Sequence, residues 1–151
     1  EIVEKLSVMD YNGRKFTLSR NRVKFKYRDA GLGRYIILGA RLVLEKSPKA
    51  KIYSKMSAYM LARRRSIDWR HPSAGCVFKN PAGDSAGRLI DSCGLKGKKV
   101  GGAEVSRKHA NFIVNTGSAT CADVLMLMKQ VKSAVRARFA VTLRPEIKIW
   151  R

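Results

Sequence analysis

Acidic side chains are scarce in this sequence of 151 residues. The sequence contains 11 Asp and Glu residues and 32 Lys and Arg residues, which gives a formal net charge of +21. A field of that sign attracts polyanions such as nucleic acid, phosphorylated ligands and anionic lipid. The cations are spread along the whole chain, which is typical of a generally basic surface. A dedicated polyanion site remains the alternative interpretation.

Long apolar runs, paired cysteines and clustered histidines are also lacking. No run approaches the roughly 20 apolar residues of a membrane helix, so we expect no membrane insertion. Cys76, Cys93 and Cys121 are widely spaced and form neither a CxxC metal pair nor a disulfide framework. That usage is typical of a reducing cytoplasm. With only His71 and His109 beside them, we expect no metal site.

The first residues lack the marks of a chain start. Glu1-Ile2-Val3-Glu4 has no initiating Met, and it has neither the cationic end nor the apolar core of a signal peptide. We therefore expect a processed product or a fragment. Apolar residues make up 45% of the total, which is enough for a real core, and the length suits one domain or two small ones.

The first part of the chain is expected to be mainly β structure. Alternation on either side of Asn12-Gly13 predicts a hairpin, and residues 35–44 predict a long, largely buried strand. Such strands at the start of a chain leave open edges, so the front of a sheet is expected to be missing. Ser47-Pro48 predicts the start of a helix whose apolar stripe faces the core: Ile52, Met56, Tyr59 and Met60.

The second part combines helices and strands. Asp84 or Ser85 is expected to cap a short helix that ends at Gly94, and 111–115 is expected to be a strand. Thr120 and Asp123 predict the start of a longer helix with a core-facing stripe, Val124, Met128, Val131, Val135 and Phe139. Residues 141–150 alternate around Pro145 and predict a closing strand. The fold class is α+β, with domains at 1–68 and 69–151 divided where the pattern breaks over 68–72.

The stretch from Ser73 to Pro81 brings small residues, a thiol, a cation and an amide together. Small residues allow a ligand to approach the backbone, and Lys79 and Asn80 supply donors that suit anionic or amide-bearing ligands. A loop that leads into a strand would explain the same residues without a ligand. The basic turn at Gly101-Gly102 could cradle phosphate, but it lacks the spacing of a recognised phosphate loop.

Three polar positions are not explained by core packing: Arg28, Cys76 and Glu146. They could be a buried thiol and two structural ion pairs. Alternatively, a cation, a proton donor and a carboxylate around one centre suit the reduction of a conjugated carboxylate. In that reaction hydride reaches one carbon, enolate-like charge develops, and an acid protonates the other carbon.

The motifs resemble those of a known family. Ser73 to Pro81, Ala86-Gly87-Arg88-Leu89-Ile90, the long stretch from Gly101 to Asn115, and Pro145-Glu146-Ile147 resemble the C-terminal half of the UDP-N-acetylenolpyruvoylglucosamine reductases. Phe25-Lys26-Tyr27-Arg28 is similar to the family's Phe-Gly-Tyr-Arg element, with Lys26 where glycine is usual. The resemblance covers essentially the whole sequence.

The resemblance implies a reaction and roles for the residues. NADPH reduces bound FAD, and the flavin passes hydride to UDP-GlcNAc-enolpyruvate to form a peptidoglycan precursor in the cytoplasm. Cys76 matches the family's proton donor, while Arg28 and Glu146 match the residues that stabilise the enol intermediate. Asn80, and with less support Lys79, match substrate contacts. A thiol, with an ordinary pKa of about 8.5, is a stronger acid than a hydroxyl.

Part of the family's pattern is absent from this sequence. The FAD-binding N-terminal region is missing, and 1–68 resembles only the end of an FAD-binding subdomain, followed by a substrate-binding domain at 69–151. At Ser66-Ile67-Asp68 the family usually carries Thr-Gln-Pro. We therefore expect a chain without reductase activity of its own, whose flavin half lies upstream or on another chain. The alternative is a non-catalytic basic module derived from this fold that binds RNA or is part of a ribonucleoprotein, although no RNA-recognition motif is visible.

Overall fold

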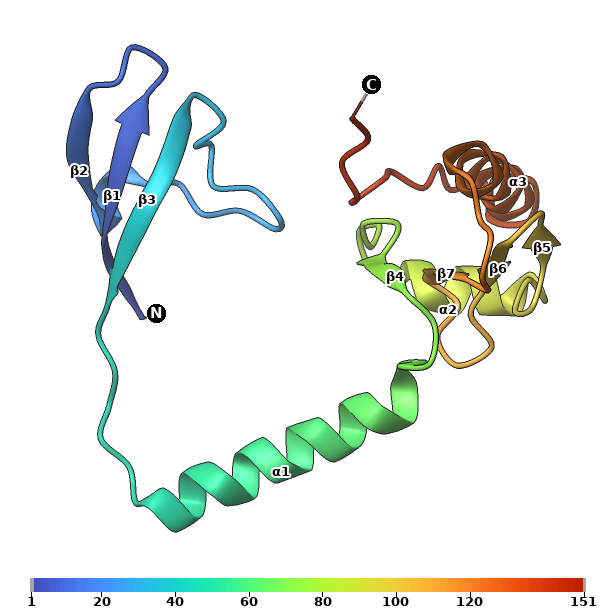
Figure 1. Cartoon of the computed structure of the whole chain (residues 1–151), viewed down its shortest axis with the longest axis horizontal. Coiled ribbons are helices and arrows are strands. Elements are labelled where there is room, and N and C mark those ends of the chain that lie inside the picture. Colours follow the sequence, from blue (N-terminus) through green and yellow to red (C-terminus); the bar gives the residue numbers. More distant parts are fainter. Residues whose placement is uncertain (1, 151) are drawn as a thin grey trace. The chain divides into compact units, whose positions relative to one another are not determined.

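The structure is a computed structural model that describes residues 2–150 and forms two compact units, Glu1–Ile52 and Tyr53–Arg151 (Figure 1). Helix α1 (Lys49–Ser66) begins in the first unit and continues in the second. The predicted domains, 1–68 and 69–151, assign all of α1 to the first part instead. That boundary stays a prediction.

The first unit is a three-stranded antiparallel sheet with the strand order β2-β1-β3. It contains β1 (Val3–Asp10), β2 (Lys15–Ser19), the short 3-10 helix η1 (Arg20–Arg22) and β3 (Tyr35–Leu42). The predicted hairpin is confirmed, because β1 and β2 pair across the Asn12-Gly13 turn and Gly13 takes a positive φ of 82°. A small core holds the sheet together: Leu6, Val8, Leu18 and Val23.

Strand β3 differs from the prediction of a largely buried strand. It ends at Leu42, and Ile36, Ile37 and Leu38 are 43 to 55% exposed. Within residues 2–150, β3 pairs only with β1 and therefore lies at the edge of the sheet. A run of apolar residues fits a strand covered on both faces, but the run itself does not say which chain segment provides the cover.

Helix α1 also differs in its burial. The expected apolar stripe is exposed, from 43% at Ile52 to 70% at Tyr59, and no residue of the helix is buried. The first intrahelical bond runs from the Ile52 N–H to the Pro48 carbonyl, so the helix begins one residue later than Ser47-Pro48 predicted. Within residues 2–150, no helix is both long and apolar enough to cross a membrane.

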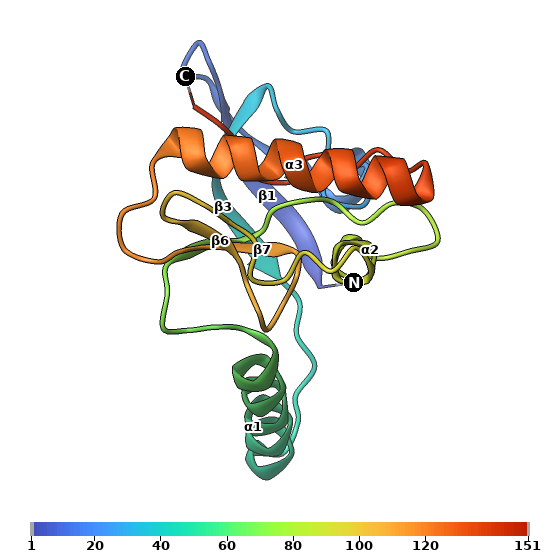
Figure 2. The same ribbon diagram turned by 90° about the vertical axis from the view of Figure 1, so that its right-hand side faces the viewer.

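The second unit joins a four-stranded antiparallel sheet to two helices. Its strands are β4 (Ser73–Cys76), β5 (Lys99–Val100), β6 (Ala103–Val105) and β7 (Phe112–Asn115), in the order β4-β7-β6-β5. Helices α2 (Ala86–Ser92) and α3 (Cys121–Phe139) pack with the sheet, and Figure 2 shows α3 running across it. The α+β class predicted from the sequence is confirmed.

Both helices of this unit begin where their caps predict. The Ser85 hydroxyl accepts a hydrogen bond from the Arg88 N–H at 3.1 Å, and α2 is followed by Gly94 with a φ of 68°. At α3, the Thr120 hydroxyl and the Asp123 carboxylate each accept a bond from the other's backbone N–H. The predicted α3 stripe faces the core: Met128, Val131 and Val135 are buried, and Val124 and Phe139 are partly buried against it. Leu127, which the stripe did not include, is also buried.

The end of the chain is not the strand that alternation predicted. Residues 141–150 form only an isolated bridge between Phe78 and Pro145. Two backbone bonds flank the bridge, from the Lys79 N–H to the Arg144 carbonyl and from the Glu146 N–H to the Val77 carbonyl, both 2.8 Å long. Phe78 and Pro145 thus form a non-hydrogen-bonded pair, so the Pro145 nitrogen, which carries no N–H, points away from Phe78 and no bond of the bridge depends on it.

Close packing explains the two glycines of the Gly101-Gly102 turn. The structure therefore gives no support to the interpretation that this turn cradles a phosphate. A Cβ added at Gly102 would lie 2.3 Å from the Ala119 nitrogen, and one at Gly101 would lie 2.5 Å from the Asp123 carboxylate. The turn therefore sits directly against the beginning of α3. Only glycine permits an approach this close.

Candidate functional site

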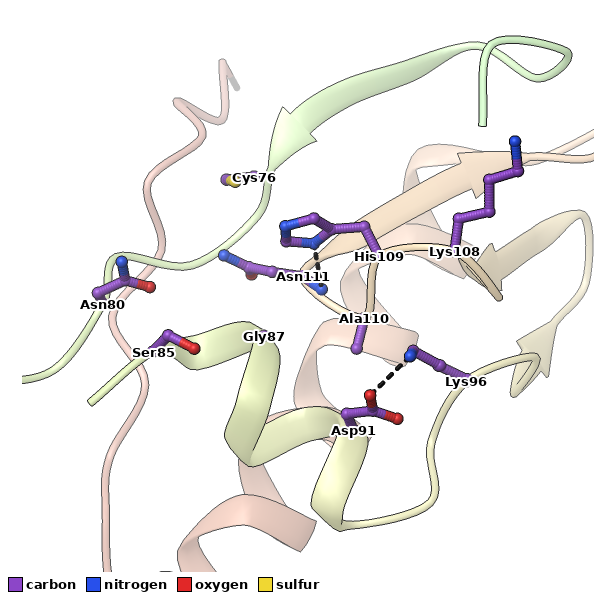
Figure 3. A pocket seen from close by; sticks show the side chains of 10 residues that line it. All are labelled: Cys76, Asn80, Ser85, Gly87, Asp91, Lys96, Lys108, His109, Ala110 and Asn111. Carbon is purple, nitrogen blue, oxygen red and sulfur yellow. Dashed lines mark hydrogen bonds and ion pairs between the residues drawn. The ribbon is translucent and has the colours of Figure 1, made fainter. Parts of the chain in front are cut away.

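A cavity of about 280 Å³ opens beside the end of β4 (Figure 3). Three segments line it: the β4 end with Cys76 and Asn80, the start of α2 with Ser85 and Gly87, and the loop between β6 and β7 with Lys108 to Asn111. Asp91 and Lys96 complete the lining. The cavity thus brings together two of the residues predicted from the sequence, Cys76 and Asn80.

Asn111 holds the wall that carries Cys76. It is 3% exposed, and its Oδ1 accepts from the Phe78 N–H at 3.0 Å while its Nδ2 donates to the Phe78 carbonyl at 2.8 Å. Its own carbonyl accepts from the Val77 N–H at 2.8 Å. Since buried backbone groups need partners, this asparagine sets the path of the chain directly after Cys76.

Asn80 connects that wall to helix α2. Its Oδ1 accepts a hydrogen bond of 3.0 Å from the Ala86 N–H, one of the N–H groups at the start of the helix. The amide oxygen therefore has a structural partner.

His109 is a cavity residue that the sequence analysis counted among possible metal ligands and within the Gly101–Asn115 family stretch, without giving it a role. Its Nδ1 lies 3.2 Å from the Asn111 N–H, which donates to it, so the neutral ring carries its proton on Nε2. Burial lowers the pKa of His109 below its usual range, and the positive charge of Lys96 lowers it further. Figure 3 shows the Nε2 side of the ring turned toward the part of the cavity where Cys76 lies. The ring is thus a neutral hydrogen-bond donor.

The position of His109 depends on Gly87. A Cβ added to that glycine would lie 3.3 Å from the Cε1 of the imidazole ring, tighter than an ordinary contact. The ring of Phe112 also packs against the imidazole, with ring centres 4.7 Å apart. No sequence spacing links positions 87 and 109, so only the packing of α2 against this loop reveals the pair.

The charged groups of the cavity lining are two lysines, Lys96 and Lys108, and the carboxylate of Asp91. The Lys96 Nζ lies 2.6 Å from an Asp91 carboxylate oxygen. The Lys108 Nζ donates at 3.4 Å to the Arg64 carbonyl in the last turn of α1, and Figure 3 shows this side chain extending away from the His109 ring. In the sequence both lysines belong to stretches that resemble the family, but neither was predicted as a site residue. Charge alone gives no sign of which cations share a cavity.

The other predicted site residues lie elsewhere in the chain. Lys79 is half-buried, does not line the cavity, and is tied through its N–H to the Arg144 carbonyl. Arg28 belongs to the first unit, at the tip of a tight turn with a φ of 56°, and its guanidinium lies 5.8 Å from the centre of the Tyr27 ring. Glu146 is bonded through its N–H to the Val77 carbonyl, next to Cys76. The roles of all three stay predictions.

The described residues do not fit a flavin. In the first unit the glycines with positive φ are Gly13, which closes the β1–β2 turn, and Gly31, whose N–H donates to the Asp29 carboxylate. Neither leads into the N-terminus of a helix, where a dinucleotide's phosphates would bind. Within residues 2–150, no three His, Cys, Asp or Glu side chains lie together in a way that could hold a metal ion.

The cavity combines a thiol, an amide, a neutral imidazole donor and two ammonium groups, one of them paired with the Asp91 carboxylate. These groups suit a polar or anionic ligand held beside an acid. The fold and the site thus define a small α+β domain with a polar cavity. The model of one protein family, described as "UDP-N-acetylenolpyruvoylglucosamine reductase, C-terminal domain", matches residues 67–150. The chain belongs to the UDP-N-acetylenolpyruvoylglucosamine reductase family.

Individual relatives agree with that family. The sequence is 44% identical to UDP-N-acetylenolpyruvoylglucosamine reductase 2 of Symbiobacterium thermophilum over 99% of this chain and 49% of the relative. It is 43% identical to the reductase of Caldanaerobacter subterraneus over 99% of this chain and 50% of the relative. The crystal structure of the reductase (MurB) from Thermus caldophilus matches with a TM-score of 0.85 and 38% identity, over 99% of this chain and 53% of that one. The chain spans about half the length of the curated relatives it matches.

Proposed function

We propose that this chain is the substrate-binding half of a UDP-N-acetylenolpyruvoylglucosamine reductase, which reduces the enolpyruvyl group of UDP-GlcNAc-enolpyruvate with NADPH and FAD in the cytoplasm. The observation that carries the proposal is the cavity that gathers Cys76, Asn80 and His109 in a chain whose relatives bear that name. The product is a precursor for peptidoglycan.

Cys76 is the proton donor in this proposal. When the substrate is reduced, one carbon must gain a proton, and the thiol at the cavity wall supplies it and becomes a thiolate. The Nε2–H of His109 and the positive charge of Lys96 favour an anion in the cavity, whether that anion is the thiolate or a substrate oxygen. Arg28 and Glu146 stabilise the enol-like intermediate, and Asn80 and Lys79 contact the substrate.

The cofactor is held by a half of the enzyme that this chain does not contain. Three observations support this: the chain spans about half the length of its relatives, its described residues do not fit a flavin, and the apolar β3 is exposed. The chain alone is therefore expected to be inactive. The part of the reaction that its own residues can perform is to bind the substrate and donate the proton.

The proposal is tested by reconstitution with the N-terminal half of the Symbiobacterium thermophilum relative. Activity should appear only with both halves, and Cys76→Ala should lower kcat by about 10² to 10⁴ while KM changes little, since general acid catalysis contributes that much. Cys76→Ser should retain part of the rate, because a hydroxyl can also donate a proton. A reconstituted Cys76→Ala enzyme as fast as the parent would contradict the role of the thiol.

A second candidate function is a non-catalytic module that binds RNA, which the net charge of +21 favours. It predicts retention on RNA that weakens steeply with salt, together with no affinity for UDP-N-acetylglucosamine. The reductase proposal predicts that this nucleotide sugar binds, and that Asn80→Ala and His109→Ala weaken its binding in calorimetry. His109→Gln, which keeps a neutral donor, should weaken it less.

A further inference from the structure

Trp69 is a large aromatic side chain that core packing does not explain. It is 61% exposed and lines a second cavity of about 470 Å³ together with Met60, Arg63 and Arg64. The Cζ of Arg63 lies 5.8 Å from the centre of the indole ring. A flat aromatic face with an apolar neighbour and two guanidinium groups suits a ligand that is aromatic at one end and anionic at the other.

The loop that carries Trp69 is held rigidly from its buried side. The Asp68 side chain is 12% exposed and accepts hydrogen bonds from the Arg70 backbone N–H at 3.1 Å and from the Arg70 Nε at 3.1 Å. His71 Nδ1 lies 3.1 Å from the other carboxylate oxygen. Hydrogen bonds from Arg70 hold the pKa of Asp68 well below its usual range, so this anchor stays charged at neutral pH. Trp69 is therefore presented by a preorganised turn.

A hydrogen bond of Lys108 links the linings of the two cavities. This residue lines the cavity of Cys76, and its Nζ donates to the carbonyl of Arg64, which lines the cavity of Trp69. A ligand whose reacting end lies beside Cys76 would therefore have Lys108, Arg63 and Arg64 along its way to the indole. A nucleotide sugar has that order of parts: the sugar, the diphosphate and the base.

We propose that Trp69 is a stacking platform for the nucleobase of the nucleotide sugar, with Arg63 and Arg64 beside its diphosphate. The inference rests on the proposed function and deepens it, because it assigns the base-binding end of the same substrate. Its physical basis is the face-to-face contact of a base with an aromatic ring, which is sequence-tolerant and contributes most when the ring is held in place. The cations favour this occupant over an uncharged peptide segment.

The test uses the fluorescence of the 151-residue chain carrying Trp150→Phe, which leaves Trp69 as the one tryptophan. UDP and UDP-N-acetylglucosamine should quench it, and inorganic diphosphate should quench it far less. In calorimetry Trp69→Ala should weaken the binding of UDP about 5- to 150-fold, the range expected for loss of one stacking contact. The affinity for inorganic diphosphate should stay unchanged. Trp69→Phe, which keeps an aromatic face, should lose much less of the affinity for UDP.

The outcomes separate this inference from the function on which it rests. If UDP-N-acetylglucosamine binds and Trp69→Ala binds it equally well, the platform is wrong while the reductase proposal stands. If ADP quenches the fluorescence of Trp69 as strongly as UDP does, and UDP-N-acetylglucosamine does not bind, Trp69 is a stacking platform for nucleobases but the reductase proposal fails. If no nucleotide quenches Trp69, or if a single-stranded RNA displaces UDP at much lower concentration, the nucleotide-sugar platform is overturned.

Discussion

The side-chain amide of Asn111 bonds to both the N–H and the carbonyl of Phe78. Gly102 has no side chain, which lets its backbone lie directly against the backbone of Ala119. Both act at the scale of single residues. Neither would stand out by chemistry alone, since an asparagine and a glycine are ordinary in loops. Their importance comes from burial and from distances that only the folded chain defines.

Replacing Asn111 with Ala should destabilise the second unit by about 2 to 4 kcal/mol. The substitution leaves the N–H and the carbonyl of Phe78 without partners in a buried site, and each such group costs about 1 to 3 kcal/mol. Urea denaturation measures the effect. Ser118→Ala, at an exposed position of the same unit, is the control and should change stability by less than about 0.5 kcal/mol. Equal midpoints for the two variants would refute the role of Asn111.

Gly102→Ala should cost at least about 1 to 3 kcal/mol, the usual range for overpacking. The new methyl group would lie 2.3 Å from the Ala119 nitrogen, and backbone at the start of α3 cannot move aside as a flexible side chain would. Thermal unfolding reports the change. The matched control is Gly33→Ala, where the added Cβ meets nothing within 4 Å, so its melting temperature should stay near the parent's.

At the scale of elements, caps decide where helices begin, and packing decides which of their faces are covered. Helices α2 and α3 start at Ser85 and Thr120 because those hydroxyls bond to N–H groups that have no helical partner. The stripe of α3 is buried, whereas the stripe of α1 is exposed. The same 3.6-residue periodicity therefore led to one correct expectation of burial and one wrong one.

The capping box of α3 should make stability depend on pH. Hydrogen bonds from Thr120 lower the pKa of Asp123 below its ordinary value of 3.8, so its stabilisation is complete above that value. It is lost as the pH falls further, through the lower pKa of the folded state. Hydrogen bonding to Arg88 likewise lowers the pKa of Asp84 to about 2.

Urea midpoints measured from pH 6 down to pH 2 test this dependence. Asp123→Asn should flatten the acid limb of the curve, and Thr120→Ala should lower stability by about 0.5 to 2 kcal/mol at pH 6. The comparison variant is Asp10→Asn, in a turn of the first unit, which should leave the acid limb of the second unit as it is. If stability falls with decreasing pH as steeply in Asp123→Asn as in the parent, the capping box is not the cause of the acid destabilisation.

At the scale of the whole molecule, apolar surface and charge act against each other. The chain exposes apolar side chains along β3 and α1, which promotes association, while a net charge of +21 keeps copies apart. Among its described residues, 2–52, the first unit has four buried core residues. Such a unit is expected to need a covering partner for stability.

Substituting Ile37 and Leu38 with Thr should therefore raise the solubility of the isolated chain, most clearly at high salt where its charge is screened. Light scattering against salt concentration measures this. The same double substitution should impair reconstitution with an N-terminal half, since it removes apolar surface that a partner would cover. Ser7→Thr, at an exposed position of the neighbouring strand, controls for a change of strand residue without that loss. If the double variant reconstitutes as well as Ser7→Thr, β3 is not the covered surface.

The sequence by itself determined the features that depend on neighbouring residues. The Asn12-Gly13 hairpin, the Ser85 and Thr120 caps, the alternation of strands and helices, and the family motifs around Cys76 all follow from local chemistry within a few positions. Only the tertiary structure decided that His109 and Lys108 share a cavity with Cys76, that β3 and α1 lie exposed, and that 141–150 is a single bridge. The reason is physical: a periodic pattern records which residues share a face, whereas burial, pKa and contact depend on segments brought together from far along the chain or from outside it.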